Sequence, residues 1–117
     1  MSQITTHVLD TTRGKPAQNL PITLFAQTQN GWDELASGVT NADGRISGLL
    51  ADDVVLAAGI YRMHFATKPY FEANNEKGFY PYVDIVFELD GSSHNSKSHY
   101  HIPLLLTAFG YSTYRGS

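Results

Sequence analysis

Apolar and polar residues alternate along most of the chain, a pattern typical of strands that bury one face. In the segment QITTHVLD, Ile4, Thr6 and Val8 fall on one face, and His7 falls on the other. The same alternation, enriched in β-branched and aromatic residues, recurs in LPITLFAQT, WDELASGVT, IYRMHFAT, FYPYVDIVFELD, HYHIPLLLTA and YSTYR. These segments predict about seven or eight short strands.

Short turn signals separate the expected strands. Asn30-Gly31 lies between two alternating segments and predicts a hairpin, in which both residues adopt the positive φ of a type I′ turn. In NADGR, Asp43-Gly44 predicts a second turn. Tight turns of this kind join strands that run antiparallel to each other.

One segment, KPYFEANNEKG, is predicted to form a helix of about two turns at most. Pro69 suits the first turn of a helix, and Gly78 suits the position after its end. One short helix among several strands favours an all-β fold. We therefore expect a two-sheet antiparallel β-sandwich, because alternating helices and strands are not found.

The size and composition of the chain limit what it can be. Its 117 residues suit a single domain, residues 1–117. The absence of cysteine excludes disulfides, thiolate catalysis and zinc sites that use sulfur. A net charge of -3, with 8 scattered Lys and Arg, argues against nucleic acid or an anionic membrane as a partner. No leader or membrane span is visible, so a cytoplasmic location is expected.

Histidines are the main candidates for chemistry, and two of the 5 lie close together in SHYHIP. His99 and His101 are two positions apart on a predicted strand, so their side chains share a face about 7 Å apart. That spacing suits a metal, but no further cluster of ligands is visible, so we predict no metal site. The sequence identifies no partner for His64 or His94, and both are interpreted as structural.

The remaining candidates have ordinary explanations when each is taken alone. His7 is expected to point away from the core, and Arg45 follows a turn, where a surface arginine is common. Nucleophile elbows and phosphate-binding glycine loops are not found. The residues by themselves therefore support a β-sandwich with outward-facing polar groups, a description that also fits many noncatalytic binding modules.

Three segments taken together resemble a known family. HVLDTTRGKPA, NADGR and HYHIPLLLTAFGYSTYRGS are similar, in order and spacing, to segments of the 5-hydroxyisourate hydrolases, the transthyretin-related enzymes of urate breakdown. The resemblance runs from His7 to Ser117, and the C-terminal Tyr-Arg-Gly-Ser is its most distinctive part. One small departure is Thr107-Ala108, where the family often has Ser-Pro.

The resemblance implies an activity and the residues that carry it. The reaction would be hydrolysis of 5-hydroxyisourate, the product of urate oxidation, to 2-oxo-4-hydroxy-4-carboxy-5-ureidoimidazoline, a step in the degradation of urate to allantoin. The implied catalytic residues are His7, Arg45 and His101. The implied substrate-binding residues are His7, Arg45, Tyr114 and Ser117.

The resemblance also implies a transthyretin-like fold, a homotetramer built as a dimer of dimers, sites at the dimer-dimer interface and no cofactor. It leaves open which histidine is the general base and what His99 does. For Arg115 it leaves an ion pair and a direct role equally open. The alternative function is that of a transthyretin-like carrier, which binds a small ligand without hydrolysing it.

Overall fold

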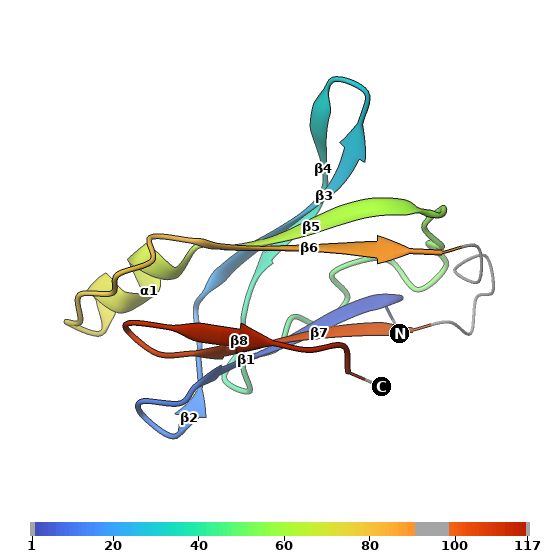
Figure 1. Cartoon of the computed structure of the whole chain (residues 1–117). Coiled ribbons are helices and arrows are strands. Elements are labelled where there is room, and N and C mark those ends of the chain that lie inside the picture. Colours follow the sequence, from blue (N-terminus) through green and yellow to red (C-terminus); the bar gives the residue numbers. More distant parts are fainter. Residues whose placement is uncertain (1, 91–98, 117) are drawn as a thin grey trace.

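Two four-stranded sheets pack against each other around one hydrophobic core (Figure 1). The computed structural model describes residues 2–90 and 99–116. The elements are β1 (Ile4–Asp10), β2 (Lys15–Pro16), β3 (Pro21–Thr28), β4 (Gly31–Val39), β5 (Gly59–Phe65), α1 (Thr67–Ala73), β6 (Val83–Leu89), β7 (Tyr100–Leu106) and β8 (Tyr111–Thr113). The strand order is β2-β1-β7-β8 in one sheet and β4-β3-β5-β6 in the other. The predicted two-sheet β-sandwich with one short helix is confirmed.

The core lies between the sheets because each sheet turns alternate side chains toward the other. β1 buries Ile4, Thr6 and Val8, the face that the alternation predicts. One cluster of buried side chains joins both sheets, with Phe65 and Leu104 fully buried in it. We propose on this basis that residues 1–117 form a single domain.

The central strands of the first sheet, β1 and β7, are parallel, so the expectation of an entirely antiparallel sandwich is wrong at this pair. Their register places Thr5 beside His101 and His7 beside Pro103. A parallel pair needs a long connection, and here the whole second sheet lies between the two strands in sequence. Local turn signals therefore do not reveal this pairing.

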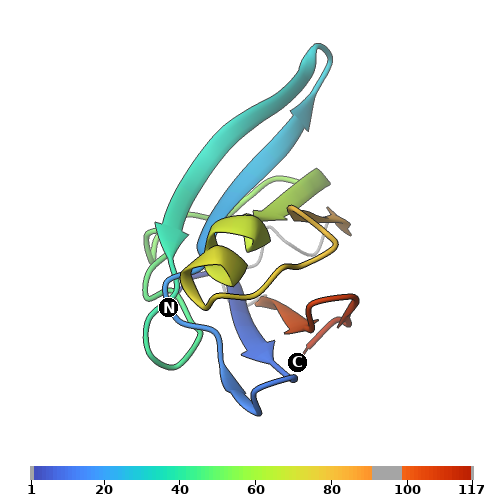
Figure 2. The same ribbon diagram turned by 90° about the vertical axis from the view of Figure 1, so that its left-hand side faces the viewer.

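The β3–β4 hairpin forms as predicted, but with a different turn. Thr28 pairs with Gly31, so Gln29 and Asn30 are the two loop residues. Among the described residues other than glycine, only Asn19 and Asn75 have positive φ, and a type I′ turn is thus excluded at Asn30. Figure 2 shows the tip of this hairpin projecting away from the rest of the molecule.

The helix α1 is as short as predicted, but it ends earlier. Pro69 lies in its first turn, whereas the chain leaves the helix at Asn74 and Asn75, not at Gly78. Asn75 has a φ of 57°, the left-handed conformation that commonly follows a helix. No helix in the described part of the chain is long and apolar enough to cross a membrane.

A buried polar contact fixes α1 against the end of β1. The hydroxyl of Tyr70 donates a hydrogen bond of 2.6 Å to Asp10, whose side chain is buried. Arg13 Nε lies 3.2 Å from the same carboxylate oxygen, Oδ2, which also accepts the hydrogen bond from Tyr70. Burial and the hydrogen bond to Asp10 raise the pKa of Tyr70, so its hydroxyl stays protonated and remains a donor at neutral pH.

Tyr70→Phe should lower the free energy of unfolding by about 1–3 kcal/mol, because the buried Asp10 carboxylate loses a hydrogen-bond donor. Urea unfolding followed by circular dichroism measures this change. The matched control is Tyr82→Phe, since the side chain of Tyr82 is exposed; a change within about 0.5 kcal/mol is expected there. Equal stability of the two variants would contradict the proposed anchor.

Candidate functional site

The parallel pairing of β1 and β7 brings two of the predicted histidines onto one surface. Thr5 and His7 point outward from β1, and His101 points outward from β7. Because Thr5 and His101 are direct partners in the register, the side chains of His7 and His101 are near neighbours on the same outer face. Both rings are half-buried.

Arg45 is brought to this face by the predicted turn. The side chain of Asn41 accepts hydrogen bonds from the backbone N–H groups of Asp43 and Arg45. The carbonyl of Gly44 then accepts a 2.9 Å hydrogen bond from the N–H of Val8, which fastens the turn to the edge of β1. His7 directly precedes Val8 in β1, so the turn that carries Arg45 lies beside this histidine.

Only glycine fits at position 44. Its φ is +74°, and a Cβ atom there would collide with the backbone oxygen of Val8. The close approach of the two backbones is what places Arg45 next to the histidines. The glycine in NADGR is thus explained by packing as well as by turn conformation.

The ring of His7 is held and tuned by the same turn. It hydrogen-bonds the backbone of Asp43, which raises its pKa, but burial and the nearby Arg45 charge outweigh this and lower the pKa below 6.5. An imidazole with a lowered pKa is neutral at pH 7. His7 therefore offers a free basic nitrogen beside a permanent positive charge.

His101 has a similar environment. Burial lowers its pKa, and the charges of Arg45, His99 and His7 lower it further. Thr5 Oγ1 lies 2.8 Å from His101 Nδ1 and 2.8 Å from His99 Nε2. The rings of His99 and His101 are stacked with centroids 6.4 Å apart, as their predicted shared face requires.

The C-terminal segment extends the same sheet and covers part of His101. Beyond β8, the N–H of Gly116 donates a 2.8 Å hydrogen bond to the carbonyl of His101. A Cβ at position 116 would lie 2.6 Å from His101 Cδ2, so a larger residue would displace the ring. Glycine at this position is therefore a packing requirement.

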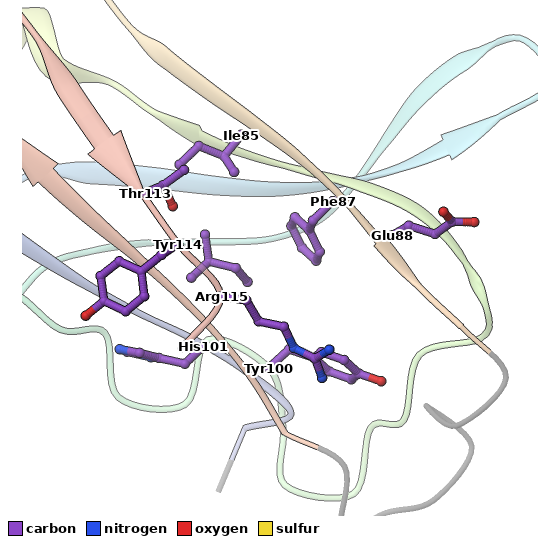
Figure 3. A pocket seen from close by; sticks show the side chains of 9 residues that line it. Ile85, Phe87, Glu88, Tyr100, His101, Thr113, Tyr114 and Arg115 are labelled. Carbon is purple, nitrogen blue, oxygen red and sulfur yellow. The ribbon is translucent and has the colours of Figure 1, made fainter. Parts of the chain in front are cut away.

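A cavity of about 220 Å³ opens beside this segment, between the edges of the two sheets (Figure 3). His101 and Tyr114 line it, and in Figure 3 their rings extend to the same side. Arg115 extends the other way, with its guanidinium 4.9 Å from the centre of the Tyr100 ring. The rest of the lining is mainly apolar and includes Ile85 and Phe87 from β6.

The structure thus brings together His7, Arg45 and His101, and it places Tyr114 next to His101. Tyr114 is 59% exposed, so its hydroxyl is accessible from outside. Ser117 lies outside the described residues, as does His94. Arg115 makes a cation–π contact, a role that the sequence does not indicate.

His64 corrects one expectation, because it has a partner. Its Nδ1 lies 2.7 Å from Asp84 Oδ1, and these two residues face each other across β5 and β6. This pair belongs to the second sheet, away from the cluster on the first. Among the described residues, no group of three or more histidine, aspartate or glutamate side chains is arranged to hold a metal ion.

Two functional candidates, Thr5 and Gly116, are missed when the sequence is read alone. The period-two alternation does carry a signal for Thr5, since it lies two positions before His7 and must share its face. No comparable signal exists for Gly116, because its contact with His101 depends on how the chain returns to β7.

Comparisons with known proteins agree with this fold. A model of the HIUase/Transthyretin family matches residues 4–116. The 5-hydroxyisourate hydrolase of Mus musculus is 42% identical over 99% of this chain and 96% of its own length. The structure of Klebsiella pneumoniae 5-hydroxyisourate hydrolase is 33% identical, with a TM-score of 0.83 over 99% of this chain and 100% of that one. Sea bream transthyretin in complex with thyroxine is 31% identical, with a TM-score of 0.88 over 98% of this chain and 95% of that one.

Replacing Arg45 with Gln should raise the pKa of both His7 and His101 toward 6.5, because a positive charge beside the two rings is removed while their burial remains. Both rings would then be less often neutral at pH 6 than in the wild type. Titration of the histidine resonances by NMR measures the shift.

The matched control is Arg62→Gln, which removes an arginine from the second sheet, where it stacks on Phe25 and Trp32. His7 and His101 should titrate as in the wild type in this variant. Unchanged titration of both rings in Arg45→Gln would show that the guanidinium does not act on them.

Proposed function

The chain belongs to the HIUase/Transthyretin family, and from this premise we propose that it is a 5-hydroxyisourate hydrolase. Full-length similarity to a hydrolase of this name and to the Klebsiella pneumoniae enzyme structure supports the proposal. The observation that carries it is the cluster itself. Two histidines with lowered pKa values lie beside Arg45 on one face, next to a cavity of small-molecule size.

The reaction would open the six-membered ring of 5-hydroxyisourate at its N1–C6 amide bond, so the activity is that of a cyclic amide hydrolase. Hydrolysis needs a base that takes a proton from water, a group that stabilises the oxyanion, and an acid that protonates the leaving nitrogen. His7 and His101 suit the two proton transfers, since their lowered pKa values leave both imidazoles neutral at pH 7 and able to accept a proton. No cofactor is needed for these steps.

Arg45 suits the remaining task. Its guanidinium is always charged and presents several N–H donors, so it would bind the carbonyl oxygen of the substrate and stabilise the negative charge that develops there. The same charge lowers the pKa of both histidines. It therefore keeps them unprotonated and able to accept a proton from water.

Substrate binding is proposed for Tyr114 and Ser117 together with His7 and Arg45. The exposed ring of Tyr114 lines the cavity beside His101, which supports a hydrogen bond from its hydroxyl to the ligand. The role of Ser117 rests on the resemblance of the C-terminal Tyr-Arg-Gly-Ser alone, because this residue lies outside the described part of the chain.

We also propose that the protein assembles as a homotetramer, a dimer of dimers, with the sites at the dimer-dimer interface. The outer face of the first sheet supports this, since half-buried Leu9 and Leu105 lie on it beside the histidines. A second copy on this face would exclude water from the site. The cytoplasmic location stays a prediction.

A carrier function is the competing candidate. Sea bream transthyretin, in its complex with thyroxine, is similar over nearly the whole chain, and the cavity lining here is mainly apolar. A carrier would bind a small ligand saturably and release it unchanged. Formation of product therefore distinguishes the two functions.

His101→Asn should lower the rate of 5-hydroxyisourate decay by about 100-fold or more, since it removes a proton-transfer group. Urate and urate oxidase generate the substrate, and its absorbance is followed with and without the protein. The wild type should accelerate the decay beyond the spontaneous rate. Decay at the spontaneous rate would refute the proposed hydrolase function.

The control for this variant is His64→Asn, which changes a histidine of the second sheet and should keep the wild-type rate. Circular dichroism separates the two possible causes of a loss. If His101→Asn unfolds, the histidine is structural and the catalytic assignment fails.

Gly116→Ala should also reduce the rate, by about tenfold or more, because the added Cβ would push the His101 ring out of position. The matched control is Gly110→Ala, where a Cβ would meet only Thr107 Oγ1 at 3.7 Å, an ordinary contact. This control should retain the wild-type rate. Full activity of Gly116→Ala would mean that the ring position does not matter.

A further inference from the structure

Thr5 holds two histidines of the site by a single hydroxyl group. Its Oγ1 lies 2.8 Å from Nδ1 of His101 and 2.8 Å from Nε2 of His99. The parallel register makes Thr5 the direct partner of His101 on the neighbouring strand. Because threonine is branched at Cβ, its hydroxyl has few available orientations in a strand, and the contact is well defined.

The chemistry of these three groups limits how the protons are arranged. A hydroxyl donates one hydrogen bond and accepts up to two, and a neutral imidazole has one N–H and one basic nitrogen. Thr5 can therefore donate to only one of the two rings. If it donates to His99 Nε2, it is left to accept the N–H from His101 Nδ1.

We propose that Thr5 is a positioning residue that holds His101 with its proton on Nδ1, so that the Nε2 lone pair is free to accept a proton from the attacking water. This proposal rests on the function proposed above. It also gives His99 a role, as the acceptor that fixes the direction of the Thr5 hydroxyl. Neither Thr5 nor His99 needs to touch the substrate in this arrangement.

The surroundings of His101 make the position of its one proton important. The charged and titratable groups that act on it are Arg45, His99 and His7, and each disfavours its protonated form. Asp43 belongs to the same turn as Arg45 and acts on His7. His101 is therefore neutral at pH 7, and a neutral ring with its proton on Nε2 would have no basic nitrogen facing the site.

His7 has a parallel arrangement that supports this interpretation. Its ring is hydrogen-bonded to the backbone of Asp43. A carbonyl can only accept, so the nitrogen of His7 that faces Asp43 must be the one that carries the proton. The turn thus fixes the proton position of His7, and Thr5 does the same for His101. Each histidine then has one defined basic nitrogen.

Thr5→Val removes the hydroxyl at nearly constant shape and should lower kcat by about tenfold or more, with KM changed less than about twofold. Thr5→Ser restores a hydroxyl and should recover most of the wild-type kcat. The matched control is Thr23→Val, the same change on the half-buried outer face of β3, which should leave kcat unaltered. A wild-type kcat in Thr5→Val would overturn the proposal.

A second measurement needs no substrate. Nitrogen-15 chemical shifts of the histidine rings report which nitrogen carries the proton, and loss of a signal in His101→Asn identifies the His101 resonances. The wild type should show the proton of His101 on Nδ1, and Thr5→Val should show it distributed over both nitrogens. A wild-type proton on Nε2, or the same distribution in both proteins, would refute the role of Thr5.

The two measurements also separate this proposal from the function on which it rests. A wild type that fails to accelerate 5-hydroxyisourate decay overturns the hydrolase, while the nitrogen-15 shifts still decide whether Thr5 sets the proton position of His101. A wild type that is active, with Thr5→Val equally active, overturns Thr5 alone.

Discussion

The parallel pairing of β1 with β7 is the constraint on which the rest of the site depends. It sets Thr5 beside His101 and His7 beside Pro103, so the polar groups of two distant segments meet on one face. A slip of one residue would turn His7 into the core and Val8 out of it, at the cost of a fully buried side chain. The same burial of Ile4 and Val8 that stabilises the sandwich therefore also specifies the position of His7.

The two outer edges of this strand pair receive the remaining parts of the site. On the β1 side, Gly44 approaches the backbone at Val8 and delivers Arg45. On the β7 side, Gly116 bonds the carbonyl of His101 and packs against its ring. At both edges a side chain on the glycine would prevent this close approach. The two glycines therefore determine how near Arg45 and the C-terminal segment lie to the histidines.

Local patterns predicted what depends on local geometry. The period of two in QITTHVLD gave the correct faces of β1, and the turn in NADGR formed around Gly44. The sequence did not predict the parallel register, the partner of His64 or the helix end at Asn75. Each of these depends on how segments distant in sequence pack together, which local patterns do not show. The candidate residues themselves came from the resemblance to a family, and elementary patterns alone would have left His7 and Arg45 as ordinary surface groups.

Assembly and proton chemistry are physically linked in this arrangement. Burial is the largest cause of the lowered pKa of both His7 and His101, although the rings are only half-buried in the single chain. If a second copy covers this face, as we propose, the rings lose more water and the charge of Arg45 acts through a less polar medium. Both effects lower the histidine pKa values further, whereas the hydrogen bonds to Thr5 and Asp43 are already made within one chain. The single chain would thus fix the ring orientation and proton position of each histidine, and the assembly would lower its pKa further.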